Sequence, residues 1–76
     1  MVDVDLNGLI DGVARLTGPQ LRSGQIRLTR SYADGLPATR ADRDQLKQVL
    51  LNLLLNAIQA MEGGGEIRLA TRAVSL

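Results

Sequence analysis

The chain has 76 residues with no cysteine and no histidine, and its nine basic and eight acidic residues leave a formal net charge of +1. A chain this short buries only about 60% of its unfolded surface, so without disulfides it depends on apolar packing. The balanced charge and the single aromatic residue, Tyr32, argue against nucleic-acid binding. No apolar run has the length of about 20 residues that crosses a bilayer, and the lack of cysteine agrees with a reducing cytoplasm.

The first part of the chain predicts a short strand followed by an interrupted helix. The run VDVD alternates apolar and acidic residues, as in an edge strand. Apolar residues then recur at helical spacing from Leu6 to Arg22, and Asp5 or Asn7 can cap the start of the helix. Glycine is a poor helix former and proline lacks a backbone donor, so Gly18 and Pro19 predict a break near Gly18.

The middle and the end of the chain predict three further strands. In the run GQIRLTRSYA, Ile26 and Leu28 alternate with Arg27 and Thr29. The run DGLP has turn residues, ATRA is long enough for a second short strand, and EIRLATRAVSL alternates again after a second helix. The order is approximately β-α-β-β-α-β, which favours an α+β fold with helices on one face of a sheet, a two-layer α/β sandwich. A ferredoxin-like arrangement has the same order and stays open.

The clearest element is a helix at about residues 43–62. Asp42 and Gln45 have capping-box spacing at its start, and Gly63–Gly65 follow its end. Its apolar residues recur at spacings of three and four, and they predict a buried stripe centred between Leu50 and Leu53: Leu46, Val49, Leu50, Leu53, Leu54, Ala57, Ile58 and Met61. Leu51 and Leu55 lie on a third side of the helix, away from this stripe, where core packing is a simpler interpretation than the docking of a partner.

Polar residues gather on another side of this helix, about 140° from the stripe at about 100° per residue: Gln45, Gln48, Asn52, Asn56 and Gln59. The simplest interpretation is a solvent-exposed edge. However, asparagine is a poor helix former, and its side chain offers an oxygen to a hard cation and an NH₂ group to a phosphate. Asn52 and Asn56 could therefore serve one magnesium ion and the phosphates that it bridges.

The run DQLKQVLLNLLLNAIQAMEGGGEIRL, from Asp44 to Leu69, resembles the N-box helix and the following strand of the ATP-binding catalytic domain of sensor histidine kinases. These kinases belong to the GHKL superfamily, with gyrase and MutL, and the chain is most similar to the nitrogen-regulatory type. VDLNGLIDGVARL resembles the first strand and helix of that domain, and QIRLTRSYADGLPATRADRDQL resembles the hairpin before the N-box. The resemblance implies that residues 1–76 are the amino-terminal part of a Bergerat-type ATP-binding fold.

This resemblance also implies a nucleotide site. Asn56 would supply an oxygen to the Mg²⁺ that bridges the ATP phosphates, Asn52 would line the same site, and Gln59 stands where many relatives carry a basic residue that touches phosphate. Hydrolytic members have a glutamate as general base at the place of Asn52. An amide is a poor proton acceptor, so the resemblance favours transfer of the γ-phosphoryl group to a protein histidine over hydrolysis of ATP, and no residue of the chain is expected to be catalytic.

The resemblance implies partners and missing parts as well. A histidine-containing dimerisation domain must supply the phosphate acceptor, because the chain has no histidine, and a response regulator would receive the phosphate. The adenine-holding segment, the lid and the second glycine motif of the complete domain are absent, and Gly63–Gly65 lacks the spacing of a phosphate-binding loop. We expect the isolated chain to be inactive and to bind neither ATP nor Mg²⁺. The alternative is a module that self-associates or exchanges strands through an uncovered apolar face. The segment is expected in the cytoplasm, and the kinase that contains it can be membrane-anchored.

Overall fold

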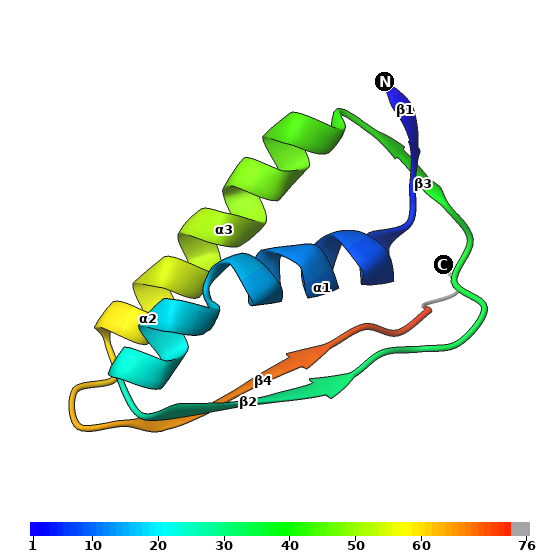
Figure 1. Cartoon of the computed structure of the whole chain (residues 1–76). Helices are drawn as coiled ribbons and strands as arrows, with labels where there is room; N and C mark the ends of the chain where they lie inside the picture. Colours follow the sequence, from blue (N-terminus) through cyan, green and yellow to red (C-terminus); the bar gives the residue numbers. More distant parts are fainter. Residues whose placement is uncertain (74–76) are drawn as a thin grey trace.

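A computed structural model describes residues 1–73 (Figure 1). The elements are β1 (Val2–Val4), α1 (Leu6–Leu16), α2 (Gly18–Ser23), β2 (Ile26–Ser31), β3 (Thr39–Ala41), α3 (Arg43–Gln59) and β4 (Gly65–Ala70). This order confirms the predicted α+β arrangement, with the first helix divided in two. The predicted final strand, residues 66–76, is confirmed as far as Ala70 and wrong for residues 71–73, which are not strand, and residues 74–76 lie outside the described residues. None of the described helices has the length and apolar character needed to cross a membrane.

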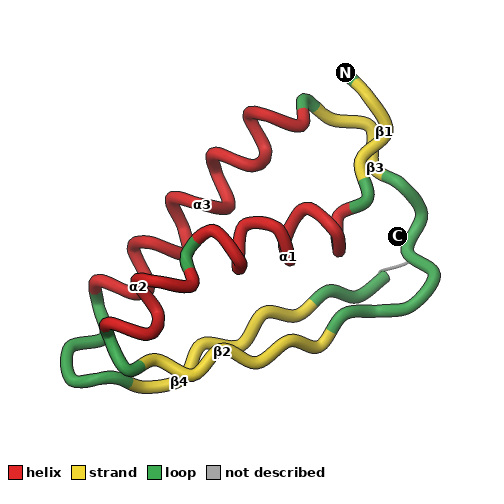
Figure 2. The backbone as a smooth tube through the Cα atoms, in the orientation of Figure 1, coloured by secondary structure: helices red, strands yellow, loops and turns green. Residues whose placement is uncertain are grey.

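The strands of residues 1–73 form two small sheets. β1 and β3 pair antiparallel, with Val2 opposite Ala41, whereas β2 and β4 pair in parallel, starting with Ile26 opposite Gly65. The expected hairpin between β2 and β3 is therefore wrong. The connection between these strands contains Pro37 and is longer than a tight hairpin turn, so it carries the chain from one sheet to the other. Figure 2 shows β2 and β4 running beneath the helices and β1 and β3 at one end of them.

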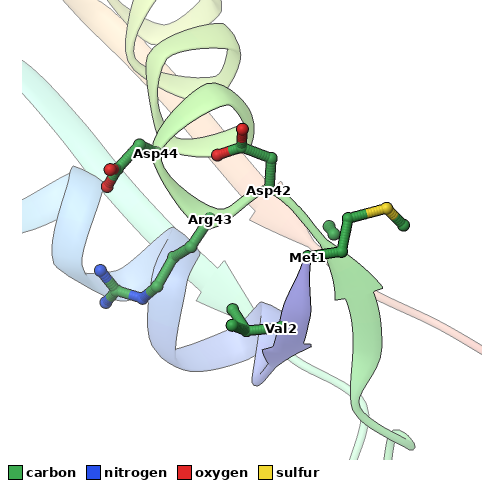
Figure 3. Close-up of a pocket in the computed structure, with 6 residues that line it drawn as sticks. Met1, Val2, Asp42, Arg43 and Asp44 are labelled. Atoms are coloured by element: carbon green, nitrogen blue, oxygen red, sulfur yellow. The ribbon is translucent and has the colours of Figure 1, made fainter.

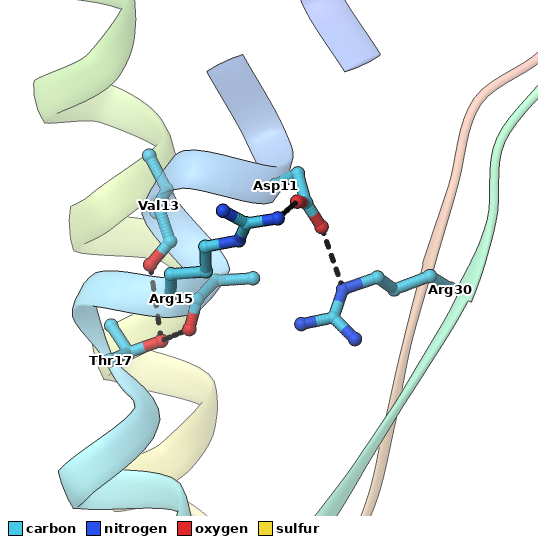
Figure 4. Close-up of polar contacts among 6 residues, drawn as sticks. Asp11, Val13, Arg15, Thr17 and Arg30 are labelled. Carbon is cyan, nitrogen blue, oxygen red and sulfur yellow. Dashed lines mark hydrogen bonds and ion pairs between the residues drawn. The ribbon is translucent and has the colours of Figure 1, made fainter. Parts of the chain in front are cut away.

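The break between α1 and α2 lies at Thr17, beside the predicted position. The Thr17 hydroxyl donates to the carbonyl oxygens of Val13, at 3.3 Å, and Ala14, at 3.0 Å (Figure 4). A hydroxyl that bonds back to the preceding turn competes with the regular helix ladder and often bends a helix. Pro19 then stands in the first turn of α2, where its missing N–H group is not needed.

The buried apolar side chains come from five elements: Val4, Leu9, Val13, Ala14, Leu21, Ile26 and Leu54. The buried face of α3 differs from the predicted one, because Leu54 is 6% exposed whereas Val49 and Leu53 are 50% and 61% exposed. The predicted centre of the stripe, between Leu50 and Leu53, is therefore wrong by about 70° at about 100° per residue. Apolar residues cover most of the circumference of α3, so their period alone does not select the side that packs on α1.

A polar network ties the start of α1 to the segments that follow β2 and β4. The Thr71 hydroxyl donates to Asn7 Oδ1 at 2.7 Å and accepts from the Ala33 N–H group at 2.9 Å. Asn7 Nδ2 donates to the Ala33 carbonyl oxygen at 2.8 Å. Asn7 thus bonds to the segments after β2 and β4, and of the two predicted capping residues it is Asp5 that caps α1. The network joins residues far apart in the sequence at the end of the β2–β4 sheet.

Replacing Thr71 by valine is expected to lower the free energy of unfolding by about 1–3 kcal/mol, because it leaves partly buried groups of Asn7 and Ala33 without a partner. Thr29→Val is the matched control, since the Thr29 hydroxyl is buried and has no hydrogen-bond partner in the described part of the chain. That variant should be as stable as the parent or more stable. Urea denaturation measures both values. An equal loss of stability in the two variants would contradict the role of the network.

Candidate functional site

The helix α3 positions the predicted site. It begins at Arg43 because Asp42 caps it, with Asp42 Oδ1 accepting from the Gln45 N–H group at 3.2 Å, as the sequence predicts. It ends at Gln59, earlier than the predicted end near residue 62, and Ala60 is its carboxyl-terminal cap. Seventeen residues of regular helix therefore hold the polar side chains at fixed spacing.

The glycine run after α3 forms a tight turn. Gly64 has a φ of +100°, and a Cβ atom there would lie 2.7 Å from the Gln25 carbonyl oxygen. A side chain is therefore excluded by both the backbone conformation and the close approach. The turn places Gly65 opposite Ile26 at the start of the parallel pair. This agrees with the interpretation of Gly63–Gly65 as a helix-ending turn.

The five predicted polar side chains all lie exposed on α3 and form what we call the amide face: Gln45, Gln48, Asn52, Asn56 and Gln59. Within it, Gln48 Nε2 donates to Asn52 Oδ1 at 3.1 Å, a bond between neighbouring turns. The side chains of Asn56 and Gln59 make no hydrogen bond to any residue in 1–73. Their polar atoms are directed to solvent, where a ligand can meet them.

The donor set of the amide face fits a magnesium ion that also binds phosphate. No group of three histidine, cysteine, aspartate or glutamate side chains within the described residues could hold a metal ion. Magnesium prefers oxygen ligands, keeps several waters and commonly takes one or two protein oxygens beside substrate phosphates. The amide oxygens of Asn52 and Asn56, about one turn apart, match that demand. Gln59 adds an uncharged NH₂ donor for a phosphate oxygen.

The amide face is an open surface. The predicted ligand side chains line none of five cavities found in residues 1–73. Figure 3 shows one of these cavities, of about 260 Å³, at the start of α3 beside Met1 and Val2. Two carboxylates, of Asp42 and Asp44, line it against the single guanidinium group of Arg43, and Asp42 already caps the helix there. This cavity is thus no substitute for a phosphate site.

Comparisons with known proteins agree with the resemblance. The chain is 48% identical over 64 residues, 84% of its length, to the sensor histidine kinase ZraS of Escherichia coli strain K12. It is 45% identical over 73 residues, 90% of its length, to the sensory histidine kinase/phosphatase NtrB of Rhizobium leguminosarum bv. phaseoli. The solved catalytic domain of histidine kinase ThkA, in a nucleotide-free form, covers 97% of the chain with a TM-score of 0.89 and 31% identity. The chain is homologous to the catalytic domain of sensor histidine kinases.

Homology to histidine kinases extends over most of this chain but over a small part of its relatives. The chain spans 14% of ZraS, 18% of NtrB and 50% of the ThkA catalytic-domain structure. A second ThkA structure was solved in complex with the response regulator protein TrrA. It matches 93% of the present chain, which covers 22% of the ThkA chain, with a TM-score of 0.77 and 33% identity. No family model matches the chain. The predicted family and α+β fold class are confirmed.

Proposed function

We propose that this chain supplies one wall of the ATP site of a sensor histidine kinase, which transfers the γ-phosphoryl group of ATP to a protein histidine. The observation that carries the proposal is the exposed amide face of α3 in a homologue of a histidine kinase catalytic domain. The oxygens of this face suit Mg²⁺ and its NH₂ groups suit phosphate.

Each amide has a separate role in this proposal. Asn56 supplies an oxygen to Mg²⁺, Asn52 lines the same site, and Gln59 donates to a phosphate oxygen. Bound Mg²⁺ supplies positive charge that neutralises the charge developing on the phosphoryl oxygens. The chain itself orients these amide side chains, because α3 holds them on one rigid face and the hydrogen bond from Gln48 restrains Asn52. Asn52 carries no carboxylate to accept a proton from water, which favours phosphoryl transfer over hydrolysis.

The proposed protein partners are a histidine-containing dimerisation domain and a response regulator. The phosphate acceptor must lie outside these 76 residues, because they contain no histidine. The structure of ThkA bound to the response regulator protein TrrA supports the second partner. Both partners belong to the complete kinase system.

A chimera tests the proposed function. In it, the chain replaces the matching half of the ThkA catalytic domain, and a fluorescent ATP analogue is titrated with and without magnesium. We expect magnesium-dependent binding by the chimera and none by the isolated chain. A folded chimera, verified by circular dichroism, that binds no nucleotide or binds it equally without magnesium would contradict the proposal.

Self-association of the isolated chain stays a separate prediction. Leu16, Val49 and Leu53 are each at least half exposed, on α1 and α3. Exposed apolar side chains of this kind favour association when they form one patch. Light scattering over a wide concentration range measures the mass. A monomer mass that stays constant over this range would contradict the prediction.

A further inference from the structure

Three arginines from three elements surround one cleft of about 320 Å³ between the helices and β2: Arg15 of α1, Arg22 of α2 and Arg30 of β2. Asp11 pairs with two of them, its Oδ2 lying 3.1 Å from Arg15 Nη2 and its Oδ1 lying 2.9 Å from Arg30 Nε (Figure 4). Arg22 has no ion pair within the described residues. One carboxylate against three guanidinium groups leaves an excess of positive charge, so the cleft favours an anionic ligand.

The floor of this cleft is apolar. Ala14, Leu21 and Ile26 are buried there, and Leu28 is half-buried. None of the lining residues comes from β4 or α3, so the cleft opens along the edge of β2 that faces away from β4. Within residues 1–73, β4 is the one strand that pairs with β2. The N–H and carbonyl groups along the other edge are therefore available to an added strand.

We propose that this cleft binds an extended acidic segment of a partner protein, which adds to the free edge of β2 as a further strand. Backbone bonds to β2 hold such a segment, while its side chains determine specificity. Its apolar side chains cover the floor at Leu21 and Ile26, and its carboxylates pair with Arg15, Arg22 and Arg30. The combination of an open strand edge, an apolar floor and a basic rim favours a peptide of this chemistry. The site is separate from the amide face, so this inference does not depend on the proposed function.

The probe is a synthetic peptide of about six residues, the length of an ordinary strand, with glutamate, valine and glutamate at every second position, so that these three share the face toward the cleft, and threonine between them. Titration into the isotopically labelled 76-residue chain should shift the amide resonances of residues 26–31. Arg22→Glu should weaken binding by about tenfold or more, because a close charge pair becomes a repulsion. Arg27→Glu is the matched control, since Arg27 is exposed, lies on the opposite face of β2 and does not line the cleft. It should change the affinity by about twofold at most.

Altered peptides separate strand addition from simple charge attraction. N-methyl groups on alternate residues keep the carboxylates but prevent the backbone ladder, so binding should be lost. The same peptide with lysine in place of both glutamates should not bind. The proposal would be overturned if either altered peptide bound as tightly as the acidic peptide, or if the shifted amide resonances lay outside β2. Absence of any binding by the acidic peptide would overturn it as well, and binding of decanoate in its place would assign the cleft to an anionic amphiphile.

Discussion

Replacing Leu54 by alanine is expected to lower the free energy of unfolding by about 2–5 kcal/mol, the usual range for a buried leucine. Leu54 is 6% exposed and is the one residue of α3 within the apolar core. A domain of this size rarely gains more than about 3–5 kcal/mol from its core, so a large share of the variant should be unfolded. Urea denaturation followed by far-ultraviolet circular dichroism measures the change.

The matched control for this variant is Leu53→Ala, on the same helix and with the same chemical change. Leu53 is 61% exposed, so its truncation should change stability by no more than about 0.5 kcal/mol. The two variants distinguish the observed packing of α3 from the buried stripe that periodicity predicts. A larger loss at Leu53 than at Leu54 would support the predicted stripe and contradict the observed one.

Replacing Asn56 by alanine in the ThkA chimera is expected to weaken magnesium-dependent nucleotide binding by about tenfold to a hundredfold, the range for losing one contact to a charged group. Binding without magnesium should change little, since the lost oxygen is the proposed metal ligand. Alanine is the better helix former at this exposed position, so unfolding of α3 does not account for the expected loss. Fluorescence titration with and without magnesium measures both affinities.

Gln45→Ala is the control for this variant, because Gln45 lies on the same amide face near the start of α3 and far from Asn56 along the helix. Its affinity for the nucleotide should equal that of the unaltered chimera. If both variants lost affinity to the same extent, the effect would belong to the helix as a whole. The assignment of Asn56 as a ligand would then fail.

Local physical chemistry was enough to predict the elements of this chain and the residues of its candidate site. The side chain of Asp42 accepts from a backbone group three residues later, so the start of α3 depends on neighbouring residues alone. The break beside Gly18 likewise depends on local backbone preferences. The amide face follows from helical spacing, and the resemblance to histidine kinases was carried by a continuous run of sequence around Asn52 and Asn56.

The tertiary structure alone decided which strands pair, which side of α3 is buried and where the arginine cleft lies. β2 pairs with β4 across a long stretch of chain, and local alternation carries no information about the partner of a strand. α3 is apolar over most of its circumference, so contact with α1 selects Leu54 over Leu53. Arg15, Arg22 and Arg30 belong to separate elements and meet only when the helices pack on β2. The sequence by itself determined the helices and strands and the amide side chains that they carry, because these depend on near neighbours. The pairing of the strands and the buried side of α3 depend on contacts between residues far apart in the chain.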